Sequence, residues 1–154
     1  MLEILKKIKN AIYTSNSLKV GKMLNQNKYN YNKYVNRHYD ILNILQFDLY
    51  PKAISEDNIF NEYAEKCIEL CIEDLKIAPF FIEWYKKECE IINKKNSSIN
   101  YGTNKYLIKI LEKQERYEEA INYCNKYISL GLTDDGTKGG IIARKEKLKK
   151  KLNK

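Results

Sequence analysis

Few residues of this 154-residue chain have the types and spacing that chemistry needs. The best candidate is the segment GLTDDGTKGG, residues 131–140. Gly131 and Gly136 have the spacing of a phosphate-binding loop, but that loop needs Lys followed by Ser or Thr, and here Thr137 precedes Lys138. Its two aspartates are adjacent, whereas a calcium loop needs acids at alternating positions. We therefore interpret the segment as structural, with Asx-type turns at the aspartates and glycines that let the chain reverse.

Histidine and cysteine are sparse and badly spaced for catalysis or metal binding. The only histidine, His38, has Asp40 two residues away, and positions i and i+2 point apart on a helix. Cys67 and Cys71 share a helix face, but a metal site needs further ligands and a disulfide within one turn has poor geometry. We expect a half-buried structural histidine and four reduced, buried cysteines. No catalytic residue, metal or cofactor is predicted, and we expect a protein that is not an enzyme.

The net charge of +8 raises the possibility of nucleic-acid binding. Residues 27–39, NKYNYNKYVNRHY, interleave tyrosines with basic residues, the pattern that single-stranded nucleic acid uses. The helical spacing of the tyrosines equally favours a core or groove lining, and a Lys-rich chain with scarce Arg is what AT-rich coding produces. Both interpretations stay open. The candidate nucleic-acid contacts are Lys28, Lys33, Arg37, Arg144, Lys145 and Lys149.

Membrane insertion is not predicted. No apolar run approaches the ~18 residues of a membrane span. Residues 1–16 alternate apolar and basic positions and so lack the apolar centre of a signal peptide. A helix over 2–12 is too short and mixed in its faces to favour a membrane surface. We expect a cytoplasmic protein.

The apolar spacing that must position these residues is helical almost everywhere. Pro51 is expected beyond the end of one helix, and Pro79 in the first turn of another. Residues 1–56 form an N-terminal helical segment without an assigned role, and 57–154 a helical domain that forms one compact unit with it. The fold class is all-α, with six or seven helices in antiparallel hairpins. The expected helices cover 1–12, 28–47, 56–76, 79–93, 103–115, 117–130 and 139–152.

Residues 101–132 resemble a tetratricopeptide repeat. Leu107 and Leu111 fill the apolar positions of the repeat's first helix, and Tyr117 and Ala120 in RYEEA fill the tyrosine and small-residue positions of its second. The ending LGLTDDGTKGG, followed by a basic helix, is similar to that of small tetratricopeptide-like proteins of bacteria and phages. The resemblance implies a short solenoid whose last helix caps the array.

The resemblance also implies a function. Stacked helical hairpins leave a groove between their first helices, and the family uses such grooves to hold peptide or protein partners. We therefore expect a non-catalytic interaction module, with nucleic-acid binding as the alternative. The positions of helix 103–115 expected to face outward into the groove are Asn104, Lys105, Ile108 and Glu112.

Overall fold

The structure, a computed structural model, describes residues 31–91 and 99–154. These residues are mostly helical and contain no strand, which confirms the all-α class. One isolated bridge joins Asn100 to Asp134. The elements are α3 (Tyr31–Ile44), η1 (Leu45–Leu49), α4 (Tyr50–Ser55), α5 (Glu62–Ile91), α6 (Thr103–Lys113), α7 (Tyr117–Ser129) and α8 (Gly140–Leu152). The expected helix over 1–12 lies outside the described residues.

The first helical run consists of α3, η1 and α4 (residues 31–55), and it passes through Pro51 instead of ending before it. Proline lacks an N–H and clashes with the carbonyl four residues earlier, so an ordinary α-helical turn does not accommodate it. Here the preceding turn, η1, is π-helical, and the N–H of Tyr50 bonds the carbonyl of Leu45. The wider turn leads into α4, which carries Pro51 at its start. Our expectation that the helix ends before Pro51 was wrong.

Helix α5 is a single helix of 30 residues, with Pro79 inside it. We expected two helices, 56–76 and 79–93, and this was also wrong. The interior proline costs about 3 kcal/mol relative to alanine. An unbroken buried stripe at helical spacing runs through the proline and offsets that cost. It consists of Ala64, Cys67, Cys71, Asp74, Ala78, Phe81 and Trp84.

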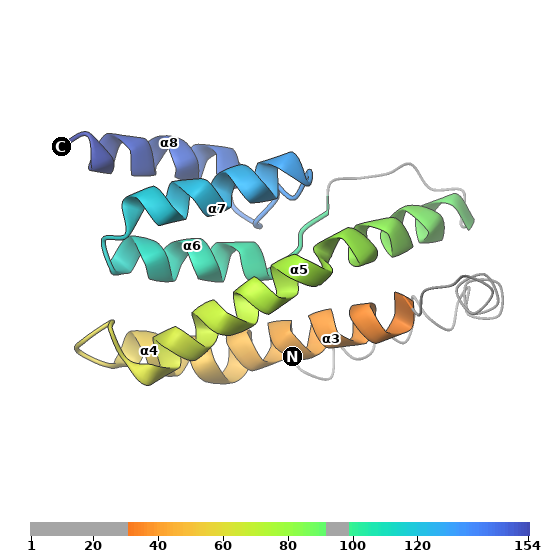
Figure 1. The fold of residues 1–154 in the computed structure, drawn as a ribbon, viewed down its shortest axis with the longest axis horizontal. Helices are drawn as coiled ribbons and strands as arrows, with labels where there is room; N and C mark the ends of the chain where they lie inside the picture. The colour runs from red at the N-terminus through yellow and green to blue at the C-terminus, as the bar shows by residue number, and fades with distance from the viewer. Residues whose placement is uncertain (1–30, 92–98) are drawn as a thin grey trace.

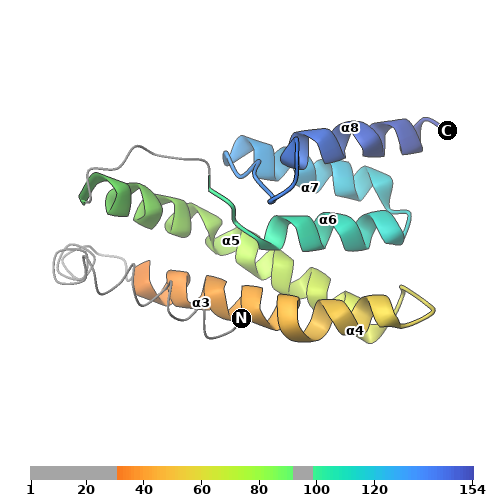
Figure 2. The same cartoon turned by 180° about the vertical axis from the view of Figure 1, so that it is seen from behind.

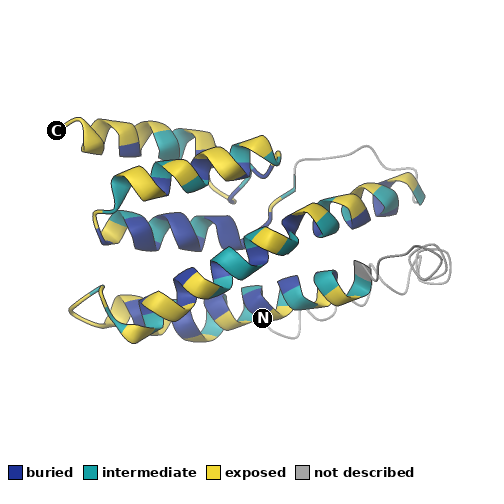
Figure 3. Ribbon diagram, viewed as in Figure 1, coloured by how far each residue is buried: buried dark blue, intermediate teal, exposed yellow. Residues whose placement is uncertain are grey.

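The helices lie in two layers. In Figure 1 α5 and α7 face the viewer, and in Figure 2 the molecule is seen from behind with α3, α4, α6 and α8 in front. Helices α6 and α7 pack against each other and run in opposite directions, joined by residues 114–116 (Figure 1). Leu107, Leu111 and Ala120 are fully buried. Figure 3 shows that much of α6 is buried. Three of the four positions that carried the sequence resemblance are therefore shielded from water, and the fourth, Tyr117, is half-buried.

The segment 131–140 has the structural role that its composition indicates. Gly131 has a φ of +76° directly after α7, a backbone conformation that glycine adopts without strain. Asp134 Oδ1 accepts a hydrogen bond from the N–H of Gly136, and Asp135 Oδ1 accepts one from the N–H of Thr137, each at 2.9 Å. These are the expected Asx turns. The chain then enters α8, which packs on α7.

One hydrophobic core unites the described helices. Ile41 and Leu45, from the first helical run, belong to the same buried cluster as Leu107 and Leu148. The described part of residues 1–56 therefore packs with the rest of the chain. All four cysteines are unpaired and buried, as their sequence environment predicts.

Candidate partner-binding groove

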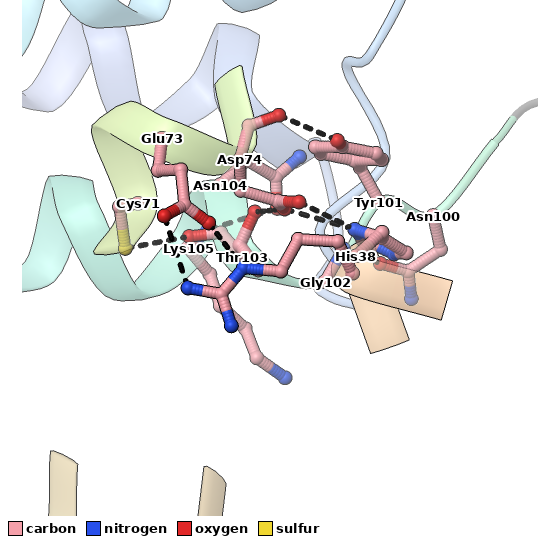
Figure 4. Close-up of polar contacts among 11 residues, drawn as sticks. His38, Cys71, Glu73, Asp74, Asn100, Tyr101, Gly102, Thr103, Asn104 and Lys105 are labelled. Atoms are coloured by element: carbon pink, nitrogen blue, oxygen red, sulfur yellow. Dashed lines mark hydrogen bonds and ion pairs between the residues drawn. The ribbon is translucent and has the colours of Figure 1, made fainter. Parts of the chain in front are cut away.

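A buried polar cluster joins α3, α5 and the start of α6. His38 Nδ1 lies 2.9 and 3.0 Å from the two carboxylate oxygens of Asp74 (Figure 4). Thr103 Oγ1 donates to Asp74 Oδ2 at 2.6 Å, and the Tyr101 hydroxyl donates to the Asp74 carbonyl at 2.6 Å. The ring of Tyr101 also stacks on His38, with 4.1 Å between centroids. A carboxylate only accepts hydrogen bonds, so it is the protonated nitrogen of His38 that faces Asp74.

This cluster corrects the expectation for His38. Its partner is Asp74, 36 residues away, and it is buried, with 1% of its surface exposed, instead of half-buried. Asp74 and Thr103 are fully buried as well. Burial raises the pKa of the Tyr101 hydroxyl, and the nearby charge of Asp74 adds to the effect. A histidine–aspartate pair is a familiar catalytic arrangement, but a substrate cannot reach His38 and Asp74, because both side chains are buried. We interpret the cluster as the polar clamp that fixes α6 on α3 and α5.

Two of the four predicted partner contacts face inward. Asn104 and Ile108 are fully buried, so the expectation that they point outward was wrong. Asn104 Nδ2 donates to the carbonyls of Leu132 and Asp134, each at 3.1 Å, which holds the loop between α7 and α8 against α6. Ile108 is buried because α6 packs between two other helices, whereas the expectation placed it on an open face. Lys105 and Glu112 are half-buried and reach the surface.

The outward face of α6 borders two adjoining depressions. One is lined by residues of α6, α8 and Tyr50 of α4, the other by residues of α8 and the loop before it. Glu112 and Arg144 line both, so the two form one continuous surface feature. Figure 2 shows the helices that border it. We call this feature the basic groove, and its lining is Tyr50, Lys109, Glu112, Lys113, Thr137, Lys138, Gly140, Ala143, Arg144, Lys147 and Lys151.

Positive charge dominates the basic groove, because six of its side chains are cationic and Glu112 is its one carboxylate. Lys151 Nζ lies 2.8 Å from Glu112 Oε2. Burial lowers the pKa of Lys109, and the positive charges of Arg144, Lys105 and Lys113 lower it further. Within the described ranges Lys109 has no ion-pair partner within 4.0 Å. The groove therefore contains cations that no carboxylate of the described residues neutralises.

Arg144 is held in a fixed position at the centre of the groove. Its Nε donates to Asp135 Oδ2, and Asp135 is fully buried. Burial opposes ionisation of Asp135, but hydrogen bonds from Arg144 and Thr137 and the charge of Arg144 outweigh it and lower the pKa of the carboxyl. The two Nη groups of Arg144 take no part in this pair.

The structure divides the predicted nucleic-acid contacts into two separate groups. Lys33 and Arg37 line a depression between α3 and α5, together with Asp40 and Glu73, and Arg37 Nη2 donates to Glu73 at 2.9 Å. Arg144 belongs to the basic groove instead. This depression shares no lining residue with the basic groove, so the predicted contacts on α3 and α8 do not line one site.

The remaining predicted contacts add little to either group. Lys28 lies outside the described residues. Lys145 is half-buried, and Lys149 lies 3.5 Å from Glu146. Lys109 and Lys113 were not among the predicted contacts, although they follow Lys105 at i+4 and i+8 and so share one helix face with it. Tyr50 was not predicted either, because no sequence signal brings α4 next to α6.

Comparison with known proteins gives no relative that would assign the groove. No protein-family model, curated protein or solved structure matches this chain. Among residues 31–91 and 99–154, no helix is both long and apolar enough to cross a bilayer. The function must therefore be argued from the geometry and charge of the site.

Proposed function

We propose that this protein is a non-catalytic interaction module that holds an acidic segment of a protein partner in the basic groove. In this proposal the helices form a tetratricopeptide-like short solenoid, with α3–α4, α6 and α8 on the binding side and α8 as its cap. The observation that carries the proposal is the row of Lys105, Lys109 and Lys113 on the outward face of α6. Within residues 31–91 and 99–154 these lysines reach the surface, and residues of α4 and α8 line the groove beside Lys109 and Lys113.

The charge of the groove indicates the partner's chemistry. Lys109 is partly desolvated among other cations, and an anionic ligand would relieve that repulsion. Tyr50 and Ala143 give the groove an apolar part that a peptide can cover. The reduced cysteines fit a reducing compartment such as the cytoplasm. Nucleic acid is the alternative, since phosphates would also meet these lysines, but Glu112 and the buried Asp135 would oppose a continuous phosphate backbone.

Affinity capture with charge-reversed variants tests this proposal. The groove variant is Lys109→Glu with Lys113→Glu. The matched control is Lys66→Glu with Lys76→Glu, which makes the same charge change at exposed positions of α5. Both variants are first checked for native helicity by circular dichroism.

Bait protein is then incubated with lysate of the native cell, with and without nuclease, and bound proteins are identified by mass spectrometry. We expect partners that survive nuclease, that the control variant retains and that the groove variant loses. Equal capture by the two variants would contradict the proposal. Partners that vanish with nuclease, together with affinity that falls steeply between about 50 and 200 mM salt, would establish the nucleic-acid alternative instead.

A further inference from the structure

The centre of the basic groove has the charge balance of a site for a doubly charged anion. Four cationic groups meet there: Lys109 and Lys113 from α6, and Arg144 and Lys151 from α8. Two carboxylates oppose them, Glu112 beside Lys151 and Asp135 beside Arg144. The formal charge that remains is +2. One carboxylate of a partner would neutralise half of it.

Arg144 supplies directed donors in addition to charge. A guanidinium has five N–H groups in a rigid plane, and the pair with Asp135 uses Nε. The two Nη groups remain, and Arg144 lines both depressions of the groove. Because the buried Asp135 fixes the guanidinium, a ligand would not have to order this side chain on binding. Planar, fixed Arg donors suit the bidentate recognition of phosphate oxygens.

From this arrangement we propose that the groove seats a phosphate monoester carried by a phosphorylated serine or threonine of the protein partner. The proposal rests on the proposed function, since it specifies the residue of the acidic segment that occupies the centre of the groove. The two Nη groups of Arg144 donate to the phosphate oxygens. The ammonium groups of Lys109 and Lys113 supply the remaining compensating charge.

The test uses the full chain and defined probes in calorimetric titrations. The first probe is inorganic phosphate, whose binding reports whether the groove contains a phosphate-binding site. The second is a short acidic peptide with a central phosphoserine, compared with the same peptide carrying serine or glutamate there. Glycerol 3-phosphate represents free metabolites, and a mixed-sequence single-stranded oligonucleotide represents nucleic acid.

We expect the phosphoserine peptide to bind about tenfold more tightly than the glutamate peptide, as one additional charge-assisted hydrogen bond implies. Glycerol 3-phosphate should bind no more tightly than inorganic phosphate. Affinity for the phosphoserine peptide should rise between about pH 5 and pH 7, because the second pKa of a phosphate monoester is about 6. The glutamate peptide should show no such rise.

Single-charge variants localise the site. Lys109→Gln should weaken binding of the phosphoserine peptide about tenfold, whereas Lys76→Gln on α5 should leave it unchanged. Glu112→Gln should tighten binding, because it removes a carboxylate and frees Lys151. A merely structural role of Glu112 would give no gain in affinity.

Each of the following results would overturn the inference: equal affinity for the phosphoserine and glutamate peptides, equal effects of Lys109→Gln and Lys76→Gln, or tighter binding of the oligonucleotide or glycerol 3-phosphate than of the phosphopeptide. In the first case, loss of both peptides in the Lys109→Glu, Lys113→Glu variant would leave the acidic-partner function standing. If no peptide binds, the inference falls, and the capture experiment decides the function separately.

Discussion

Replacement of Asp74 by alanine tests whether the buried polar cluster holds the helices together. The carboxylate accepts hydrogen bonds from His38 and Thr103, and none of the three side chains reaches solvent. The alanine variant leaves both donors buried without an acceptor. It also removes the hydrogen-bond partner of His38, which belongs to a different helix.

The expected loss follows from these contacts. A buried donor left unpaired costs about 1–3 kcal/mol, so two such donors give about 2–6 kcal/mol. A domain of this size is stable by about 5–15 kcal/mol, so Asp74→Ala should come close to unfolding it. Thr103→Val removes one donor and keeps the shape, and should cost about 1–2 kcal/mol.

These losses of unfolding free energy are measured by urea unfolding, followed by the circular dichroism of the α-helical amide band at about 222 nm. Asp40→Ala is the control, since Asp40 lies on α3 but is exposed. A loss below about 1 kcal/mol for Asp74→Ala, with an unchanged dependence on urea, would refute the view that the cluster is a clamp. A loss equal to that of Asp40→Ala would have the same meaning.

Three further predictions concern the loop before α8 and the buried thiols. Gly140→Ala should destabilise the protein by at least about 2 kcal/mol more than Gly131→Ala in the same urea assay. Both glycines have a positive φ, but only a Cβ at position 140 would lie 2.1 Å from a backbone carbonyl oxygen. Burial raises the pKa of Cys67 to about 12, so the folded protein should react with a thiol reagent at about pH 8 far more slowly than the unfolded protein; fast native labelling would contradict this. The pKa of Asp135 is lowered on folding, so its contribution to stability is present above about pH 4 and is lost as the pH falls through the folded value; Asp135→Asn should therefore flatten the acid side of the stability curve, and an unchanged acid slope would count against the Arg144 pair.

The sequence by itself determined the helical class and the last three helices. Apolar spacing located α6, α7 and α8 to within a few residues of their bounds, because helices that bury one stripe carry a period of 3.6 residues. It also determined the turn chemistry of 131–140, since Asx turns and glycines with positive φ depend on local backbone geometry alone. The reduced state of the cysteines followed from their number and spacing.

Tertiary packing determined the features that local sequence patterns do not predict. Pro51 and Pro79 are ordinary helix breakers, yet both lie in helical runs because packing along α5 and a widened turn before α4 outweigh the local cost. His38 meets Asp74 only because α3 and α5 pack side by side, and Asn104 is buried only because the loop after α7 folds back onto α6. The basic groove likewise combines Lys109, Arg144 and Tyr50 from three helices. A sequence period states which face of a helix is apolar, but the choice of neighbour that covers or flanks that face depends on contacts between residues far apart in the chain.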